Sequence, residues 1–323
     1  MILYRWQGPA TNFGDELNTI LWPRLLPDFF DGNPAIRFLG IGSVLDRRHS
    51  SQSIKLVAGA GYGGYEGKPR LDETWVFHWV RGPHTATALG LSPRLGLGDP
   101  AVLVPSTIGL PPPAGQDIGF MPHFESAAWG AWQQAADAAG VRLIDPRAPP
   151  LAIMQALGGC KMLLSEALHG VIVADAMRLP WVSIRPMALV HRPKWLDWAA
   201  TMEVRPRFRT LPASTLFEWV GTSRLSAFHA VRVWLGQTEH RLRRTAPDRF
   251  IARAAQALRE AAKLAPQLSS DAALDRCRSR MLEAVTAIRT DPLRDLASPP
   301  GGAAARSRLP GTGDSAYQLT PIG

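Results

Sequence analysis

The sequence predicts an α/β protein built from two doubly wound units and a helical extension. Short apolar runs alternate with helix-sized segments up to about residue 184, which is typical of βαβ units and parallel sheets. Three consecutive prolines at 111–113 interrupt the alternation and cannot continue a helix or a central strand. Beyond residue 214, apolar residues recur at helical spacing. We therefore expect domains at 1–110 and 114–200, a helical extension at 214–290 and a disordered tail at 298–323.

The first unit is expected to begin with a strand at residues 1–6. An amphipathic helix should follow at 15–26, because Asp15 and Glu16 occupy its first turn, where negative charge is favourable. Another helix is expected to start near Thr85. Further apolar runs between turns predict strands at 36–41, 55–58, 74–80 and 101–104.

The alternation restarts after the prolines. Residues 127–139 are predicted to form a helix that ends at Gly140, a residue type common just beyond helices. Shorter helices are expected at 151–158 and 170–177, and strands at 117–122, 141–144, 160–164 and 181–184. In the extension, three longer helices are expected at 216–235, 250–264 and 272–288.

Composition points to a soluble cytoplasmic protein. Hydrophobic residues make up 46% and charged residues 20% of the 323 positions, and no apolar run reaches the roughly 18 residues of a membrane span. The N-terminus lacks a signal-peptide pattern. Cys160 and Cys277 lie too far apart in the sequence for metal-ligand spacing or a disulfide framework, which favours a reducing compartment.

The net charge of +9 is concentrated near the C-terminus. Nineteen of the 36 basic residues but only 11 of the 27 acidic residues lie beyond residue 200. Such a region can contact anionic lipid, and it is equally typical of a solvated helix face. The basic and aromatic spacing of a single-strand nucleic-acid binder is absent from the sequence, so no nucleic-acid partner is expected.

The most informative stretch joins an expected strand to an expected helix at residues 165–170. Ser165, Glu166 and His169 gather at this joint. A helix N-terminus beside polar side chains attracts anions, because unpaired N–H groups and the helix dipole point at the same place. The alternative is a buried joint with a capping serine and a structural histidine.

Two glycine-containing turns in the first unit have a similar position. At the first, Asn12 can bond a ligand, Gly14 lets the backbone approach it and Asp15 can accept a proton; a simple helix cap is the alternative. The second, at 59–64 and including Gly61, can cradle a phosphate or a sugar edge. It does not match the dinucleotide-binding fingerprint, and a mobile turn is the alternative.

Three further positions add charged or aromatic groups. Arg81 can bind a planar carboxylate or phosphate with two bonds, or form a structural salt bridge. His84 follows it and can be a solvated first-turn residue. His123 follows the first strand of the second unit, where it should face a cleft between the domains. Residues 191–198 contribute Arg192, Lys194 and two tryptophans, which suit either sugar stacking or core packing.

The stretch at 165–170, the two glycine-containing turns, Arg81 and His123 all follow the expected ends of strands. Ligands of open α/β sheets bind outside the carboxyl ends of the strands. The shared location therefore predicts a single binding edge more strongly than any one motif does.

Taken in order, these motifs resemble the polysaccharide pyruvyl transferases, and most of all the exopolysaccharide branch. The resemblance runs from the first strand to about Asp197. It is carried by Asn12-Phe13-Gly14-Asp15, Arg81-Gly82-Pro83-His84-Thr85, Gly98-Asp99-Pro100-Ala101, Pro122-His123, and Ser165 with Leu168-His169-Gly170-Val171-Ile172-Val173-Ala174-Asp175-Ala176.

The resemblance implies two Rossmann-like domains in a glycosyltransferase-B-like arrangement. It also implies transfer of the three-carbon unit of phosphoenolpyruvate to a sugar as a ketal, with release of phosphate and without a metal or cofactor. In this interpretation His169 contacts the phosphate or donates a proton, Asp15 and Glu166 are candidate bases, and His123 orients the donor. The candidate substrate-binding residues are Asn12, Gly14, Gly61, Arg81, His84, Ser165, Leu168, Arg192 and Lys194.

One position departs from the family pattern. Many relatives carry an arginine before the Leu-His pair, where this chain has Ala167. Another cation, such as Arg81, Arg192 or Lys194, is then expected to hold the donor. The acceptor would be a lipid-linked or nucleotide-linked saccharide at the inner face of the cell membrane. The alternatives are a nucleotide-sugar-dependent glycosyltransferase and a catalytically silent polysaccharide-binding relative.

Overall fold

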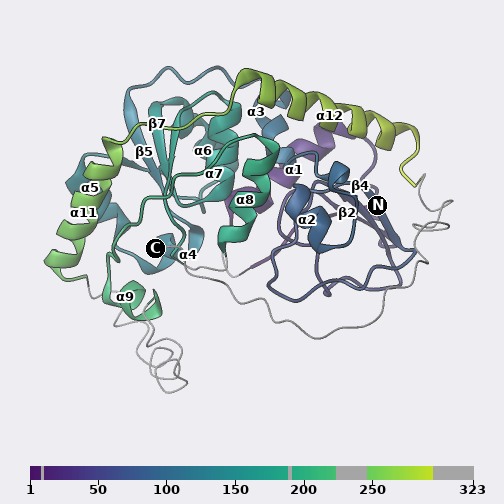
Figure 1. The fold of residues 1–323 in the computed structure, drawn as a ribbon, viewed down its shortest axis with the longest axis horizontal. Coiled ribbons are helices and arrows are strands. Elements are labelled where there is room, and N and C mark those ends of the chain that lie inside the picture. Colours follow the sequence, from purple (N-terminus) through teal and green to yellow (C-terminus); the bar gives the residue numbers. More distant parts are fainter. Residues whose placement is uncertain (9–10, 188–190, 223–245, 294–323) are drawn as a thin grey trace, which may run out of the picture.

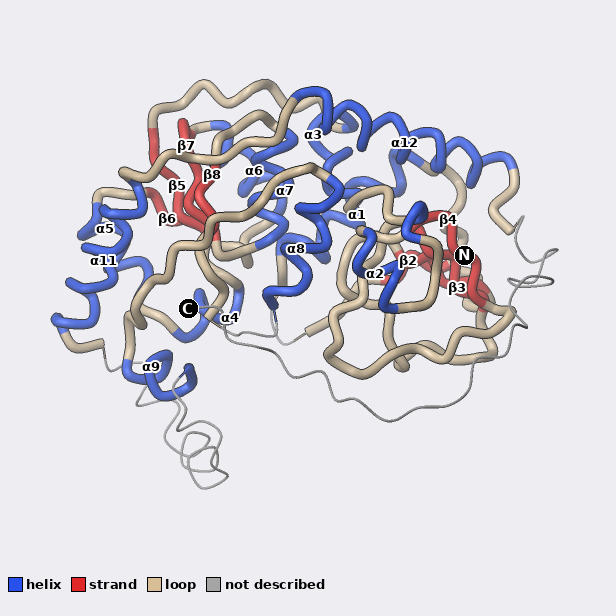
Figure 2. Tube along the Cα trace, viewed as in Figure 1, coloured by secondary structure: helices blue, strands red, loops and turns tan. Residues whose placement is uncertain are grey.

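A computed structural model describes residues 1–8, 11–187, 191–222 and 246–293 (Figure 1). Its strands form two separate four-stranded parallel sheets, which confirms the α/β class (Figure 2). In Figure 2, helices α1 (Phe13–Leu25), α6 (Pro150–Gly158), α7 (Leu168–Ala176) and α8 (Arg192–Thr201) lie between the two groups of strands.

The first sheet has the order β1-β2-β3-β4, so each strand pairs with the next one in sequence. The strands span Ile2–Tyr4, Ile36–Leu39, Ile54–Ala58 and Trp75–Trp79. Parallel strands covered on both faces are mostly apolar, and β3 follows this rule with the sequence Ile-Lys-Leu-Val-Ala. The expected strands at 1–6, 36–41, 55–58 and 74–80 are confirmed with shorter or slightly shifted ends.

The second sheet has the order β6-β5-β7-β8. Its strands are β5 (Asp117–Met121), β6 (Arg142–Leu143), β7 (Cys160–Ser165) and β8 (Trp181–Ser183). After β5 the chain adds β6 on one side and then returns to add β7 on the other. The strand order therefore reverses between β5 and β7, and such a switch point opens a crevice at the carboxyl ends of the two strands.

One expected strand is wrong. Residues 101–103 belong to a 3-10 helix, η2 (Pro100–Leu103), and residue 104 begins α3 (Val104–Thr107). The Asp99 side chain accepts a hydrogen bond from the Ala101 N–H at 3.0 Å and so starts the helix, while Pro100 fits its first position. A short buried apolar run does not reveal by itself whether it is a strand or a helix.

The expected helix at 127–139 is two helices. Helix α4 (Phe124–Trp129) stops at Gly130, whose backbone is extended, and α5 (Trp132–Ala139) follows. The predicted end at Gly140 is confirmed, because this residue is left-handed with φ of 71°. The other helices among the described residues are α2 (Pro83–Ala88), η1 (Pro93–Leu95), α9 (Leu216–Thr222), α11 (Asp248–Ala262) and α12 (Asp271–Thr290).

The C-terminal helices pack on opposite parts of the fold. Helix α11 lies beside α5, where Leu258 and Trp132 join one core cluster on the second sheet (Figure 1). Helix α12 returns toward the first sheet, and just beyond it the Pro292 carbonyl lies 2.9 Å from Nε2 of His78 on β4. The main core joins side chains of both sheets. The expected domain boundaries stay a prediction.

Two other expectations lie beyond the described ranges. These are the second part of the helix expected at 216–235, after residue 222, and the tail at 298–323. Among the helices that the structure does describe, each is too short or too polar to cross a lipid bilayer.

Candidate functional site

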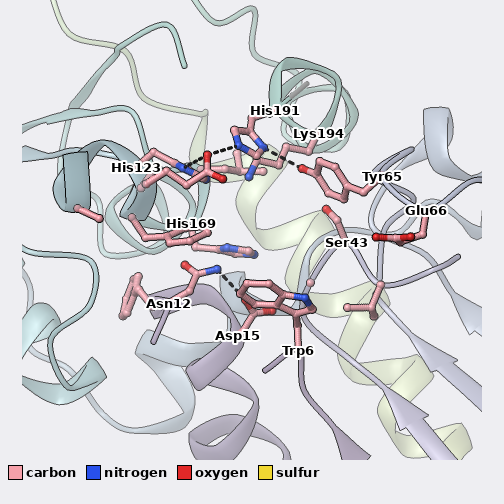
Figure 3. A pocket seen from close by; sticks show the side chains of 18 of the residues that line it. Trp6, Asn12, Asp15, Ser43, Tyr65, Glu66, His123, His169, His191 and Lys194 are labelled. Carbon is pink, nitrogen blue, oxygen red and sulfur yellow. Dashed lines mark hydrogen bonds and ion pairs between the residues drawn. The ribbon is translucent and has the colours of Figure 1, made fainter. Parts of the chain in front are cut away.

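A cavity of about 530 Å³ lies at the carboxyl ends of β5 and β7 (Figure 3). Both halves of the chain line it. The first half contributes Trp6, Asn12, Phe13, Asp15, Gly42, Ser43, Val44, Arg48, Tyr65 and Glu66, and the second contributes His123, Phe124, Glu125, Ala128, Trp129, Ala167, Leu168, His169, His191 and Lys194. Six predicted site residues therefore line one pocket: Asn12, Asp15, His123, Leu168, His169 and Lys194.

His169 enters the pocket from the first turn of α7. Its Nε2 atom lies 3.4 Å from Oδ2 of Asp99, a residue with no exposed surface. Neither atom has a hydrogen-bond partner within the part of the chain that the structure describes. The other ring nitrogen, Nδ1, lies over Gly14, where a Cβ atom would overlap it. Gly14 thus makes room for the imidazole, and it does not line the pocket itself.

Asp15 lies beside His169 on the first turn of α1. Its carboxylate accepts a 2.6 Å hydrogen bond from the Asn12 amide. Burial raises the pKa of Asp15, and the charge of His169 and the bond from Asn12 only partly offset this effect. A raised pKa makes the Asp15 carboxylate a stronger base, as its predicted role requires.

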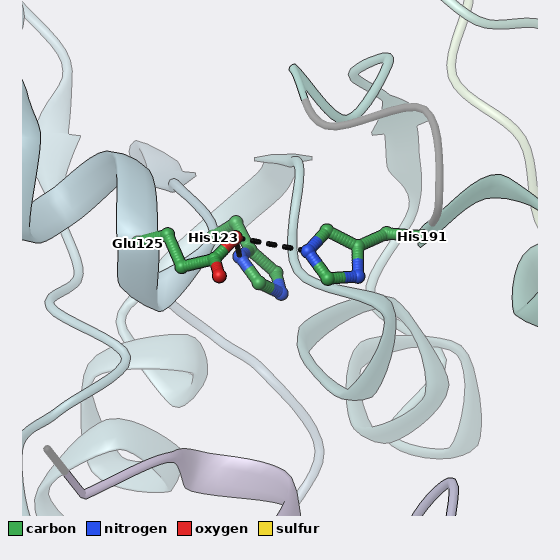
Figure 4. Close-up of side chains that lie close together, drawn as sticks. All are labelled: His123, Glu125 and His191. Atoms are coloured by element: carbon green, nitrogen blue, oxygen red, sulfur yellow. Dashed lines mark hydrogen bonds and ion pairs between the residues drawn. The ribbon is translucent and has the colours of Figure 1, made fainter. Parts of the chain in front are cut away.

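A second group of side chains, His123, Glu125 and His191, lines the same pocket (Figure 4). We call it the His123–Glu125–His191 network. Oε2 of Glu125 lies 2.9 Å from Nε2 of His191 and 3.4 Å from Nδ1 of His123. The Tyr65 hydroxyl lies 3.0 Å from the other nitrogen of His191, so the network also reaches a loop of the first half.

Burial and hydrogen bonding set the charges in this network. Burial lowers the pKa of His123 to about 3 and also lowers that of His191, so both imidazoles are neutral at pH 7. Burial opposes the charge on Glu125, but hydrogen bonds from His123 and His191 hold its pKa below the usual range. The network therefore carries one negative charge, which lies on Glu125 between two neutral rings.

The same three residues have the donor types of a divalent metal site. Their nearest ligand atoms lie within 4.8 Å of one another, and two histidines with one carboxylate suit several transition metals. The geometry is also satisfied without an ion, because the Glu125 oxygen can accept hydrogen bonds from both imidazoles.

Two cationic side chains line the pocket. Lys194 lies in the first turn of α8, and burial together with the nearby charge of Arg81 lowers its pKa to about 8. Arg48, which the sequence analysis did not select, pairs with Asp46 at 2.7 Å. Among the described residues, no ion pair involves Lys194, so its ammonium group is available to an anionic ligand.

Arg81 lies outside the pocket lining. Its side chain is 1% exposed and donates hydrogen bonds to Asp197 at 3.0 Å, Ser43 at 2.7 Å and the Tyr62 carbonyl at 3.3 Å. These contacts match the structural salt bridge that was the alternative for this residue. Because Ser43 lines the pocket, Arg81 supports the wall from behind.

Glu166 also lies behind the pocket. Its carboxylate accepts hydrogen bonds from the His123 N–H at 2.9 Å, the Ser126 hydroxyl at 3.0 Å and the Met187 N–H at 2.8 Å. These bonds hold the turn after β5 against the segment that follows β8. The arrangement positions His123 and leaves Glu166 no contact with the pocket.

The other predicted residues are also outside the lining. The Ser165 hydroxyl caps the turn through the Ala167 N–H at 3.1 Å. Gly61 lies against the guanidinium of Arg81, where a Cβ atom would overlap it. His84 is exposed on α2, and Arg192 lies between the lining residues His191 and Lys194 without lining the pocket itself.

Aromatic side chains line part of the pocket that the sequence did not indicate. The ring centroids of Trp6 and Phe124 are 6.1 Å apart, and Trp129 lies further along the same wall. Trp195 and Trp198, which had been considered for sugar stacking, are fully buried and pack in the core. The rings available for sugar stacking are therefore those that line the pocket, Trp6, Phe124 and Trp129 among them.

Sequence reasoning missed several polar residues that line the pocket: Ser43, Arg48, Tyr65, Glu66, Glu125 and His191. Glu125 and His191 lie within the motifs around His123 and Lys194, but their pairing across 66 positions has no local signal. Tyr65 follows the glycine-rich turn at 59–64, which was predicted to face a ligand.

Comparisons with known proteins give one informative match. The chain is 34% identical over 324 residues to the succinoglycan biosynthesis protein ExoV of Rhizobium meliloti (strain 1021), which covers 89% of this chain and 98% of that protein. No protein-family model matches the chain, and no solved structure matches it. Identity at this level over nearly the whole of both chains shows common membership of a family.

Proposed function

Because the chain belongs to the polysaccharide pyruvyl transferase family, we propose that it moves the enolpyruvyl unit of phosphoenolpyruvate onto a sugar of a surface-polysaccharide precursor. The product is a ketal, and phosphate is released. The observation that carries this proposal is the gathering of an imidazole, a carboxylate and an ammonium group (His169, Asp15 and Lys194) in one pocket at the strand ends. The named role of the relative in succinoglycan biosynthesis supports an exopolysaccharide acceptor.

The donor carries a carboxylate and a phosphate, so its site needs cations and N–H donors. Lys194 supplies a positive charge that no described acidic group pairs, and Arg48, which is already paired with Asp46, adds a guanidinium to the lining. The first N–H groups of α7 add a partial positive charge, since the helix begins at the pocket. Lys194 is thus our candidate for the anchor that replaces the arginine missing at Ala167.

The reaction starts with proton transfer to the donor. His169 gives a proton to the methylene carbon, and positive charge develops on the central carbon. An acceptor hydroxyl oxygen bonds to that carbon while its proton goes to Asp15. Phosphate then leaves with the electron pair of its C–O bond, and a second hydroxyl forms the other ketal bond. One proton enters the methyl group and two leave the hydroxyls, so the remaining proton ends on the phosphate.

The acceptor sugar is proposed to lie against the aromatic part of the wall. Trp6, Phe124 and Trp129 line the cavity, and aromatic side chains combine an apolar surface with defined geometry. A sugar bound there would lie between these rings and the Asp15 carboxylate.

The wider arrangement is also a proposal. Two parallel sheets that both contribute walls to one pocket are compatible with a glycosyltransferase-B-like architecture. We propose a cytoplasmic enzyme whose basic C-terminal region contacts the inner face of the membrane, where a lipid-linked acceptor would lie. Flotation with anionic liposomes at low salt tests this contact, and absence of binding would contradict it.

The function is tested by incubating the protein with phosphoenolpyruvate and a panel of lipid-linked oligosaccharides, followed by mass spectrometry. We expect one acceptor to gain a single pyruvyl unit, with one phosphate released per unit transferred. Parallel reactions contain nucleotide sugars in place of phosphoenolpyruvate. Sugar transfer in those reactions without pyruvyl transfer would overturn the proposal in favour of a glycosyltransferase.

A further inference from the structure

We propose that Asp99 is the positioning residue of an imidazole–carboxylate dyad with His169. In this dyad Asp99 holds the His169 ring with its proton on Nε2, so that Nδ1 exchanges protons with the reacting molecule. The catalytic consequence rests on the proposed function, whereas the choice of tautomer rests on geometry alone.

The first observation is that one carboxylate oxygen of Asp99 is buried without a hydrogen-bond donor in the described part of the chain. Its Oδ1 atom accepts the Ala101 N–H and caps η2, but Oδ2 has no hydrogen-bond partner within the described residues. A carboxylate oxygen without a donor is costly in a fully buried position. The ion-pair contact of Asp99 in the described part of the chain is Nε2 of His169, at 3.4 Å. An N–H at that nitrogen therefore supplies the donor that Oδ2 lacks.

The second observation is that the ring nitrogen of His169 facing Asp99 lacks a hydrogen-bond acceptor in the described ranges. This atom, Nε2, is buried and also has no hydrogen-bond partner among the residues described. A neutral imidazole carries one N–H, and the group facing each nitrogen selects which one it is. An acceptor beside Nε2 selects the Nε2–H form, because a lone pair there would face a carboxylate lone pair.

The surroundings hold both partners in place. Asp99 is fixed by its own cap bond at the start of η2, and Gly98 before it packs against Cys277 and Met281 of α12. On the other side of the ring, the Cα of Gly14 lies against Nδ1. The charged groups that face His169 are Asp99 from η2 and Asp15 from α1.

The dyad deepens the proposed reaction in one respect. With Nε2–H held by Asp99, the proton that moves to and from the donor is the one on Nδ1, the nitrogen on the Gly14 and Asp15 side. Asp99 touches no substrate in this account and acts only through His169. In a serine protease triad, replacing the equivalent aspartate with asparagine produces the wrong tautomer and lowers kcat by about 10⁴-fold.

The test uses Asp99→Asn in the full-length protein. The asparagine keeps the shape and can retain the cap, but its amide N–H can donate to Nε2 and favour the Nδ1–H form. The first readout is the nitrogen NMR signature of ¹⁵N-histidine, with His169→Gln used to assign the signals. We expect Nε2–H in the wild type and Nδ1–H in Asp99→Asn.

The second readout is the kinetics of pyruvyl transfer. Asp99→Asn should lower kcat by about 10²- to 10⁴-fold and change KM for phosphoenolpyruvate by less than about threefold. Asp175→Asn is the matched control: Asp175 is equally buried, bonded to Trp181 and Ser269, and outside the pocket. Its kcat should stay within about twofold of wild type, since it contributes nothing to the reacting atoms.

The possible results test the dyad and the proposed function independently of each other. A wild-type His169 in the Nδ1–H form overturns the dyad, and this measurement does not depend on whether the variant folds. An unchanged tautomer and kcat in Asp99→Asn overturn it as well. A switched tautomer in a protein that never transfers pyruvyl groups supports the dyad and contradicts the proposed function.

Discussion

Two imidazole–carboxylate groups contribute histidines to the same pocket, and they differ in how their polar atoms are satisfied. Figure 3 shows the three rings, His123, His169 and His191, at this pocket. In the His123–Glu125–His191 network, the carboxylate lies within 3.4 Å of both rings. The Tyr65 hydroxyl lies within hydrogen-bond distance of the second nitrogen of His191. In the His169–Asp99 pair, the facing atoms have no other partner in the described ranges. A satisfied network is suited to rigid support, whereas an unsatisfied pair is suited to proton exchange.

Burial strengthens this contrast. It lowers the pKa of His123 to about 3, so the His123 ring is neutral at pH 7 and is not an imidazolium acid. His123 can still orient a donor as a neutral hydrogen-bonding group. The acid that adds a proton to the methylene carbon is therefore expected on the other side of the pocket, at His169.

Among the next tests of this comparison, Gly14→Ala should give the largest loss of activity. A methyl group at Gly14 overlaps Nδ1 of His169, so the ring must leave its place beside Asp99. We expect kcat for pyruvyl transfer to fall by about 10²-fold or more, the lower range for loss of a general acid.

Gly158→Ala is the control for this substitution. A Cβ atom at Gly158, in helix α6, meets nothing within 4 Å, so activity should not change. Wild-type kcat in Gly14→Ala would show that His169 tolerates displacement and would remove it as the acid.

Raising the pH above 8 should give the next largest effect, because Lys194 then loses the positive charge with which it binds the donor. Its pKa of about 8 means that the ammonium is present below pH 8 and is lost as the pH rises through 8. The value of kcat/KM for phosphoenolpyruvate should then fall by about tenfold per pH unit above 8, because one proton is lost.

Lys194→Arg sharpens this prediction because arginine stays charged at every accessible pH. The fall above pH 8 should disappear in this variant, even if its absolute kcat/KM is lower. Persistence of the same fall would assign the titration to another group and would remove Lys194 as the anchor.

Tyr65→Phe should have a smaller effect, confined to the network. It removes the hydrogen bond between the hydroxyl and His191 while keeping the ring. Because Tyr65 is 38% exposed, we expect a loss of only about 0.5–1 kcal/mol in the free energy of unfolding, and less than about threefold in kcat. Chemical denaturation and steady-state kinetics measure the two quantities. A loss as large as that of Gly14→Ala would place the network in the chemistry.

Removal of divalent metals should have no effect. Glu125 can accept hydrogen bonds from both histidines, so the network is complete without an ion. We expect unchanged kcat after treatment with EDTA. Loss of activity that Zn²⁺ or Mn²⁺ restores in the wild type, but not in Glu125→Gln, would instead make His123, Glu125 and His191 a metal site.

The same contrast shows what the sequence could predict. His169, His123 and Asp15 follow the ends of strands or begin helices, and the edge of a parallel sheet brings such positions together whatever the loops do. This rule was enough to locate the pocket. Most strands were likewise predictable, since short apolar runs in a βαβ alternation have few other interpretations.

Pairing between distant residues was not predictable. Arg81 and Glu166 follow strand ends as His169 does, but Arg81 is paired by Asp197, 116 positions away, and Glu166 by the turn at His123. Local sequence gives the position of a charged group and does not say whether a partner has already neutralised it. The strand expected at 101–104 failed for a different reason, because Asp99 and Pro100 start a 3-10 helix there.

The central claim is most directly tested by comparing His169→Gln with His123→Gln in one pyruvyl-transfer assay. Each variant is incubated with phosphoenolpyruvate and the acceptor, and both pyruvyl gain and phosphate release are followed. We predict that His169→Gln lowers kcat by about 10²- to 10⁴-fold and that His123→Gln stays within about tenfold of wild type. The reverse order, with His169→Gln nearly normal and His123→Gln inactive, would contradict the account.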